Sequence, residues 1–449
     1  MISNSLTVRC RLACRVMWQG RSLEWFLPMP IFNYHSLYEV TEADMMTMKQ
    51  HRDSRALRSL TTAVCTLLLS ACGGGSSQDN SPSTPGVAVK TVVKVFGDSL
   101  MDSGAFGFKV TIQNSDKSRP FEILPEKIAN SLGASTLCPY FNFAVTGYVP
   151  NPVCTNYAVS GGRINMRGDT NTAIDTSNPA SILNQIAVGS TFLASSDIVI
   201  VDGGANDIAD LSAGYVGAIT SDGLATFTRK LSTVLPAATV ATLVTSTPTT
   251  ATLNAASAAY VQALAQLMVQ SINDKILARG VRKVVVINAV DITNTPLFGG
   301  VMDAVGATNG SAQRKAVQTS IQTWTHLFNA TLSSNLSSSR VLVVDLNSQF
   351  TQFLAQPAQY GLTNTTTPAC PKVDGGLGRA GLASLSQPAT VLACNTSNMS
   401  SRIPIGETSP NWWQSYAFSD DFHPTPALHG LMGIFVLQQL VRVGWITAT

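Results

Sequence analysis

A serine and a histidine, far apart along the chain, each stand beside residues that suit nucleophilic chemistry. Ser99 lies in the stretch Val95–Gly104, where a Gly-Asp-Ser turn follows an apolar run, so its hydroxyl can be exposed at the end of a buried strand. His423 follows Asp420 by three residues near the other end of the chain. A histidine oriented by a carboxylate can take the proton of a serine hydroxyl and carry the resulting positive charge. The two stretches therefore predict nucleophilic catalysis by a serine.

Three histidines compete for the role of base beyond the leader region of the chain. His326 lies in a helix-like segment without a nearby acid, and His429 lies in an apolar helical run, so packing or surface roles suit both. His423 alone has an adjacent acid, and the Pro-Thr-Pro segment after it can begin a helix that fixes the ring. Both Asp420 and Asp421 precede it, so the residue types alone leave the acid open.

Four separated blocks of the sequence resemble those of the GDSL, or SGNH, hydrolase family, in the order that the family uses. They are FGDSLMDSG around Ser99, then Asn156–Gly161, Gly204–Asp207 and Asp420–Pro424. The resemblance spans residues 92–430. It implies a serine esterase or lipase that hydrolyses carboxylic esters through an acyl-enzyme intermediate.

The resemblance also assigns the catalytic roles. It makes Ser99 the nucleophile and His423 the base, and its D-x-x-H spacing selects Asp420 as the acid that holds the imidazole Nδ1 while Nε2 faces the serine. We then expect Asp421 to be solvated. Asp98 lies beside the serine, and we expect it to orient the loop through hydrogen bonds.

Three hydrogen-bond donors are implied for the oxyanion that forms during ester hydrolysis. They are the backbone N–H groups of Ser99 and Gly161 and the side-chain amide of Asn206. Glycine permits close approach of the backbone, and an amide donates without titrating. A loop glycine and a turn-capping asparagine are the structural alternatives. The sequence departs slightly from the family at residues 160–162, so Gly162 remains the second choice.

Other catalytic chemistries lack local support in this sequence. Met101 stands where a G-x-S-x-G elbow needs its second glycine, and H-E-x-x-H, C-x-x-C and Walker patterns do not occur. We therefore expect no metal and no cofactor.

Four cysteines lie beyond residue 88, and we expect them to form disulfides because the N-terminal region, described next, looks like an export signal. Three pairings are possible for Cys138, Cys154, Cys370 and Cys394. Cys138 with Cys154 and Cys370 with Cys394 closes the shortest loops, so we predict this pairing. Metal binding is the minor alternative, because the spacings are wide.

The N-terminal region looks like a bacterial lipoprotein signal sequence. A basic segment from Lys49 to Arg58 precedes the apolar run Leu60–Leu69, which is far shorter than the ~20 residues that span a bilayer. Leu69–Cys72 resembles a lipobox, which makes Cys72 the lipidated first mature residue, and Gly73 after it implies sorting to the outer membrane. Plain secretory cleavage near residue 71 is the alternative.

These signals divide the chain into four parts. Residues 1–47 are expected to come from an upstream start and to have no function, since a leader from Met48 to residue 71 has a typical length. Residues 72–87 form a Gly/Ser/Pro-rich tether, and residues 88–449 form a single hydrolase domain. Residues 1–71 carry eight Lys and Arg against five Asp and Glu, so without them the net charge of +3 falls to zero. Nothing here favours a nucleic-acid partner.

The elements that must position these residues follow an α/β pattern. Strands are predicted where short β-branched runs occur, at Val92–Val95, Ile198–Val201, Val284–Ile287 and Val341–Val344. Helices are predicted around Pro125–Leu132, Ala180–Val188, Ala255–Ala278, Ala312–Leu332 and Ala427–Val441. Buried strands between helices indicate a mostly parallel sheet with function at the strand ends, and the family implies a flavodoxin-like three-layer α/β/α sandwich. The Ala/Thr/Ser-rich region 233–258 is either a helical insertion or a lid.

The sequence thus predicts a monomeric esterase or lipase of the bacterial cell envelope, held on the membrane by a lipid on Cys72 and acting on a small-molecule or lipid ester. An acyltransferase that uses the same acyl-enzyme is one alternative. A catalytically inactive binding lipoprotein is the other.

Overall fold

The computed structural model describes residues 17–18, 21–22, 91–135, 137–144, 147–166, 177–220, 223–370 and 388–447. The chain divides into two units, Met1–Pro82 and Ser83–Thr449. In the first unit, β1 (Met17–Trp18) and β2 (Arg21–Ser22) pair antiparallel. The predicted signal sequence 48–71, Cys72 and the tether 72–87 lie outside the described residues.

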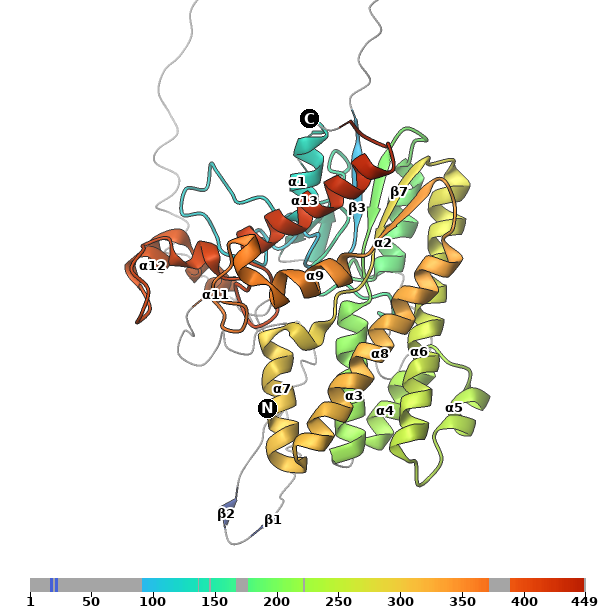
Figure 1. Ribbon diagram of the computed structural model, residues 1–449. Helices are drawn as coiled ribbons and strands as arrows, with labels where there is room; N and C mark the ends of the chain where they lie inside the picture. Colours follow the sequence, from blue (N-terminus) through green and yellow to red (C-terminus); the bar gives the residue numbers. More distant parts are fainter. Residues whose placement is uncertain are drawn as a thin grey trace, which may run out of the picture. The chain divides into compact units, whose positions relative to one another are not determined.

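A parallel sheet forms the centre of the second unit (Figure 1). Its strands occur in the order β3 (Val93–Phe96), β6 (Ile198–Val201), β7 (Lys283–Ile287) and β8 (Val341–Val344). The segment around Asn156 runs parallel to the other edge of β3, where Tyr157 N–H donates to the Val95 carbonyl at 2.7 Å. With this segment counted, the order along the sheet is 2-1-3-4-5, which is the flavodoxin-like order.

The strands are apolar on both faces because each face is covered by helices. In β6, Val199 and Val201 point into one hydrophobic core, whereas Ile198 and Ile200 point into the other. This alternation is the two-residue period of a β-strand, and β7 repeats it. A strand buried on both faces reads as a continuous apolar run, which is the pattern that predicted these strands.

Two groups of helices complete the layers (Figure 1). The first core is shared with α2 (Ile182–Gly189), α3 (Ala205–Thr220), α6 (Thr250–Ser271) and α8 (Ser311–Asn335). The second core is shared with α1 (Leu124–Ser131), α9 (Leu346–Ala355) and α13 (Pro426–Arg442). The three-layer α/β/α fold that the sequence predicted is therefore confirmed.

The remaining elements lie around this sandwich. They are β4 (Phe141–Ala144), β5 (Gly147–Pro150), α4 (Leu224–Ser232), α5 (Ala237–Leu243), α7 (Pro296–Asn309), α11 (Pro388–Ala393) and α12 (Thr396–Ser401). Short helical turns occur at Ser190–Phe192, Ile272–Ile276, Leu277–Arg279, Ile292–Asn294, Pro357–Tyr360 and Trp412–Ser415. The region 233–258 is largely helical, since α5 and the first part of α6 lie in it.

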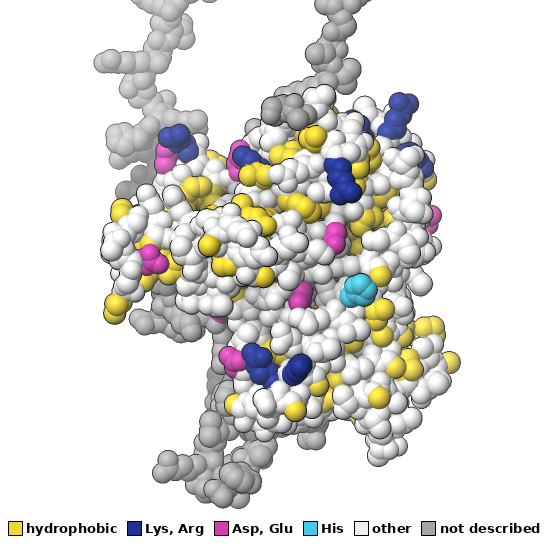
Figure 2. Space-filling model, in the orientation of Figure 1, with side chains coloured by type: hydrophobic (Ala, Val, Ile, Leu, Met, Phe, Trp, Pro, Cys, Tyr) yellow, Lys and Arg dark blue, Asp and Glu magenta, His cyan; other side chains and the backbone are white. Residues whose placement is uncertain are grey.

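Both predicted disulfides are present: Cys138 is bonded to Cys154, and Cys370 to Cys394. Figure 2 shows charged side chains of both signs scattered over a mostly uncharged face of the molecule. In the part of the chain that the structure describes, no helix has the length and apolar character to cross a bilayer.

Candidate active site

Ser99 lies in a tight turn directly after β3, at the carboxyl end of the strand. Gln185 fixes the start of this turn, because its side-chain amide donates to the Gly97 carbonyl at 3.0 Å and accepts the Gly97 N–H at 2.9 Å. Asp98 closes the turn by accepting the Leu100 N–H at 3.0 Å. Asp98 thus orients the loop through hydrogen bonds, as its place in the sequence led us to expect.

His423 lies in a second turn, between the segment around Phe418 and the start of α13. Ser419 N–H donates to the His423 carbonyl at 2.8 Å, which closes the turn. Thr425 then caps α13 by accepting the Leu428 N–H, with a proline at the first helical position. The turn therefore holds the imidazole between two fixed backbone segments.

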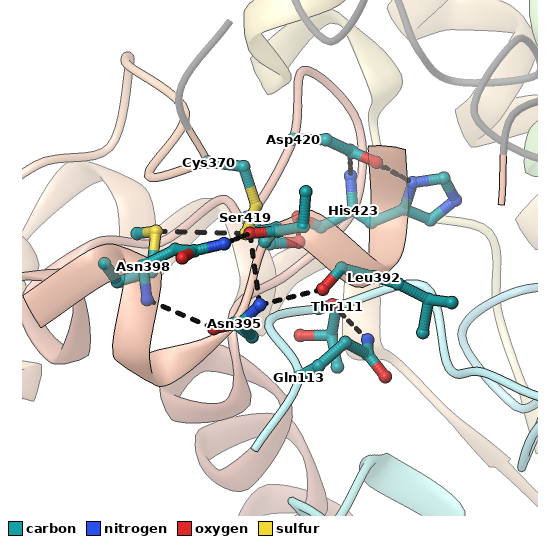
Figure 3. Close-up of a disulfide and its surroundings, with 12 residues drawn as sticks. Thr111, Gln113, Cys370, Leu392, Asn395, Asn398, Ser419, Asp420 and His423 are labelled. Carbon is teal, nitrogen blue, oxygen red and sulfur yellow. Dashed lines mark hydrogen bonds and ion pairs between the residues drawn. A yellow bond between two sulfur atoms is a disulfide. The ribbon is translucent and has the colours of Figure 1, made fainter. Parts of the chain in front are cut away.

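Ser99, His423 and Asp420 form one hydrogen-bonded triad, of which Figure 3 shows the Asp420–His423 pair. His423 Nε2 lies 2.9 Å from Ser99 Oγ, and His423 Nδ1 lies 2.8 Å from Asp420 Oδ2. The other carboxylate oxygen of Asp420 accepts the backbone N–H of His423 at 2.6 Å and that of Phe422 at 2.8 Å. All three residues are nearly buried, at 4–5% exposed. The geometry selects Asp420 over Asp421 as the partner of the imidazole.

The expectation for Asp421 is wrong, whereas His429 and His326 have the packing and surface roles that the sequence suggested. Asp421, expected to be solvated, is in fact only 6% exposed, because the Leu297 N–H at the start of α7 donates to its carbonyl at 2.8 Å and holds it against that helix. His429 is buried on α13, as a packing role requires, and its Nδ1 accepts the Leu124 N–H at 3.3 Å. Burial lowers the pKa of His429 to about 3. His326 is exposed on α8.

The two other candidate donors lie on segments next to the serine turn. Gly161 has a φ of +79°, a conformation that favours glycine. Asn206 lies in the first turn of α3, and its amide donates to the Gly162 carbonyl at 3.0 Å and lies 3.4 Å from an Asp98 carboxylate oxygen. The N–H of Gly162 already donates to the Val159 carbonyl at 3.0 Å, which favours Gly161 over Gly162 as an oxyanion donor.

Asp102, which the sequence analysis did not single out, links the serine turn to the loop of Gly161. One carboxylate oxygen accepts the N–H groups of Gly104 and Ala105 at 2.8 and 2.7 Å. The other accepts both the N–H and the hydroxyl of Ser160, at 2.8 and 2.6 Å. Burial raises the pKa of this carboxyl above its usual value, while these hydrogen bonds act in the opposite direction. Its position inside the FGDSLMDSG block was the available signal.

A second carboxylate, Asp207, was also missed as a positioning group. It lies beside Asn206 on α3 and accepts the N–H groups of Ile164 and Asn165 at 3.0 and 2.9 Å. One turn further along α3, Asp210 pairs with the Arg163 guanidinium through two bonds of 2.8 and 2.9 Å. These contacts tie α3 to the residues that follow Gly161.

The same Arg163 side chain donates to the Gly161 carbonyl at 2.6 Å. Asp210 also pairs with Lys230 at 2.9 Å. Burial would raise the pKa of Asp210, but Arg163 and Lys230 together lower it to about 2. The loop that carries Gly161 is therefore fixed by charged groups as well as by its backbone.

A pair of buried carboxyl groups lies beneath the serine turn. Asp98 N–H donates to Asp202 at 3.2 Å, and both residues are nearly buried. Burial raises the pKa of Asp98 to about 6, although the charge of His423 acts to lower it. Burial and the neighbouring Asp98 raise the pKa of Asp202 well above its usual value. A Cβ at Gly97 would lie 2.3 Å from the Asp202 carboxyl, so this position requires glycine.

An apolar pocket opens beside the serine and the histidine. Its remaining lining residues are mostly hydrophobic and come from several loops and from α3, α9 and α13: Asp98, Leu100, Ala205, Val290, Ile292, Thr295, Phe350, Phe422, Pro424 and Met432. Its volume is about 20 Å³, room for about one water molecule, so the reactive hydroxyl faces a small apolar space. Across the described ranges, no three His, Cys, Asp or Glu side chains gather where they could hold a metal ion.

A parallel α/β/α sandwich in which a serine after a strand contacts a histidine held by an aspartate has the arrangement of a hydrolase. The chain matches the family described as GDSL-like Lipase/Acylhydrolase over residues 93–435, and it belongs to that family. A search of curated proteins finds no match.

Proposed function

We propose that the protein is a serine esterase that hydrolyses carboxylic esters through an acyl-enzyme intermediate. The observation that carries this proposal is the contact of 2.9 Å between Ser99 Oγ and His423 Nε2. That distance lies within the range in which a base can accept the proton of a nucleophile.

In the first step, Ser99 Oγ attacks the ester carbonyl carbon and His423 Nε2 takes the serine proton. Asp420 holds the Nδ1–H form of the imidazole at 2.8 Å and stabilises the positive ring that results. The two backbone bonds to Asp420 keep this carboxylate in position. The protonated His423 then gives its proton to the leaving alcohol.

Negative charge develops on the carbonyl oxygen in both steps. We propose that the N–H groups of Ser99 and Gly161 and the amide of Asn206 donate to this oxygen. The positive φ of Gly161 and the place of Asn206 in the first turn of α3 support these roles. A helix N-terminus adds a favourable potential for negative charge.

The second step releases the acyl group to water. A water molecule gives its proton to His423 and attacks the acyl carbon, and the bond to Ser99 breaks as the serine recovers its proton. The mostly apolar residues beside Ser99 support contact with the apolar atoms of the ester next to its carbonyl group.

Hydrolysis of p-nitrophenyl esters, from acetate to palmitate, tests the proposal. We expect turnover by the natural chain and its loss in Ser99→Ala and His423→Ala, with unchanged circular dichroism spectra. Equal turnover by Ser99→Ala would reject the mechanism. Absence of turnover on every ester would instead favour a binding protein.

We further propose that the chain is exported and anchored in the bacterial envelope by a lipid on Cys72. The two disulfides support an oxidising compartment. Cys72→Ala should leave the protein unprocessed or release it from the membrane fraction. Unchanged processing and fractionation would argue against a lipid anchor.

A further inference from the structure

The disulfide between Cys370 and Cys394 joins a segment that bonds to the turn of His423 and a segment that is connected to this turn through Gln113 and Thr111 (Figure 3). On one side, Cys370 N–H donates to the Ser419 carbonyl at 2.8 Å. The preceding Ala369 N–H donates to the Phe418 carbonyl at 2.9 Å. These bonds hold the chain directly before Asp420.

The segment of Cys394 is connected to the turn through the short segment from Thr111 to Gln113. The Cys394 carbonyl accepts the Gln113 N–H at 2.8 Å. Two residues earlier, the Thr111 hydroxyl donates to the Pro424 carbonyl at 2.8 Å. These bonds hold the chain directly after His423.

The turn itself is closed between these two attachment points. Ser419 donates to the His423 carbonyl through its N–H at 2.8 Å and through its hydroxyl at 3.0 Å. A ring of hydrogen bonds therefore runs from Cys370 around the turn to Cys394, and the disulfide closes it covalently. The positions of Asp420 and His423 depend on this ring.

The disulfide belongs to a small hydrophobic cluster that is separate from the two cores on the faces of the sheet, whereas Phe418 before the turn packs in the second core. Its buried members are Ile112, Ala369, Cys370, Cys394, Met399, Trp412, Trp413 and Tyr416. A small cluster of this kind can open without unfolding the sheet, because local openings cost less than global unfolding. Losing the disulfide should therefore loosen the turn before it unfolds the domain.

The second disulfide offers a matched comparison. Cys138 and Cys154 are 16 residues apart, against 24 for Cys370 and Cys394, so the two loops restrict the unfolded chain to a similar degree. Cys138 braces the sheet edge, where its carbonyl accepts the Asn156 N–H at 3.2 Å. Its hydrogen bonds lead to Asn156, whose amide donates to the Met101 carbonyl after Ser99 at 2.7 Å, and not to the turn of His423.

We propose that the Cys370–Cys394 disulfide positions the Asp420–His423 pair against Ser99. The proposal rests on the proposed function, in which His423 is the base. Misplacement of a catalytic group by about 1 Å can cost roughly 10²-fold in rate. We expect Cys370→Ala/Cys394→Ala to lower kcat by about 10- to 100-fold, with KM within about threefold of the natural chain, because the turn acts on the chemical step.

The test compares this double variant with Cys138→Ala/Cys154→Ala, at a temperature where circular dichroism shows both to be folded. The second variant should lose clearly less kcat than the first, because its disulfide does not connect to the turn of His423. Full kcat in the first variant, or equal kcat losses in both, would overturn the proposal. The Ser99→Ala variant runs in the same assay: if its turnover equals that of the natural chain, the proposed function fails and the positioning role fails with it.

A milder variant covers the case in which the first double variant does not fold. Thr111→Val keeps the size of the buried side chain but removes its bond to Pro424. Loss of this single bond should lower kcat by about 3- to 10-fold with little change in KM. Unchanged kcat in Thr111→Val would contradict the ring as the positioning element.

Discussion

Replacing Asn206 by alanine tests whether the site has an oxyanion hole in addition to the Ser99–His423 pair. The amide donates to the Gly162 carbonyl at 3.0 Å and, over a longer distance of 3.4 Å, to an Asp98 carboxylate oxygen, so a substrate oxyanion has to replace only the weaker Asp98 contact. Removing one preorganised donor costs kcat about 10² to 10³, or roughly 2.7 to 4 kcal/mol. We therefore expect a loss of that size with little change in KM.

The same substitution also leaves the Gly162 carbonyl without its partner, which should lower the free energy of unfolding by about 1 to 3 kcal/mol. Asn165→Ala is the matched control, since the Asn165 amide is equally buried and donates to Thr233 and Tyr260, away from the serine. The control should lose stability in urea titrations but keep kcat on p-nitrophenyl acetate within about threefold. Near-normal kcat in folded Asn206→Ala would refute the oxyanion role, and Asn206 would then be a structural residue of the α3 turn.

Two further predictions concern groups outside the catalytic chain. Asp102→Asn places an N–H donor opposite the N–H or hydroxyl of Ser160. We therefore expect kcat to fall at least about tenfold and the free energy of unfolding to fall by about 1 to 3 kcal/mol. Unchanged kcat in the folded variant would exclude a positioning role. The buried His429 binds its proton only near pH 3, whereas the unfolded chain binds it below about pH 6.5, so acid favours the unfolded state. Between pH 6.5 and pH 3, His429 should lower the free energy of unfolding by up to about 1.4 kcal/mol for each unit by which the pH falls. In His429→Gln, the free energy of unfolding from urea titrations should therefore depend less steeply on pH between pH 6 and pH 4. Equal pH dependence in both proteins would contradict the lowered pKa of His429.

The strands were predictable because strong local signals agree with the final environment. Runs such as Ile198–Val201 are β-branched throughout, and the structure buries both of their faces. In contrast, α7 was not predicted, because Gly299, Gly300 and Gly306 give its sequence a poor helix propensity. Its N-terminus is set by Thr295, which caps the Phe298 N–H, and by a proline at the first position.

The candidate site likewise contains residues that the sequence predicted and residues that it did not. The residue types around Ser99 and His423 carry their chemistry locally, and the structure brings the two side chains into contact. The links that hold the loops are different, since Asp102 meets Ser160 across 58 residues and Asp207 meets Asn165 across 42. The residues next to an aspartate in the sequence do not indicate a hydrogen-bond partner that is so distant along the chain. A single sequence therefore reveals the reacting groups more readily than the groups that position them.

Trapping the covalent intermediate tests the central claim most directly. The purified protein would be treated with a fluorophosphonate, digested, and mapped by mass spectrometry, in parallel with Ser99→Ala. We predict one adduct, on the peptide that contains Ser99, with loss of ester turnover in proportion to labelling and no adduct in Ser99→Ala. An adduct on another residue, or full turnover by a protein that is completely labelled at Ser99, would contradict the assignment of Ser99 as the nucleophile.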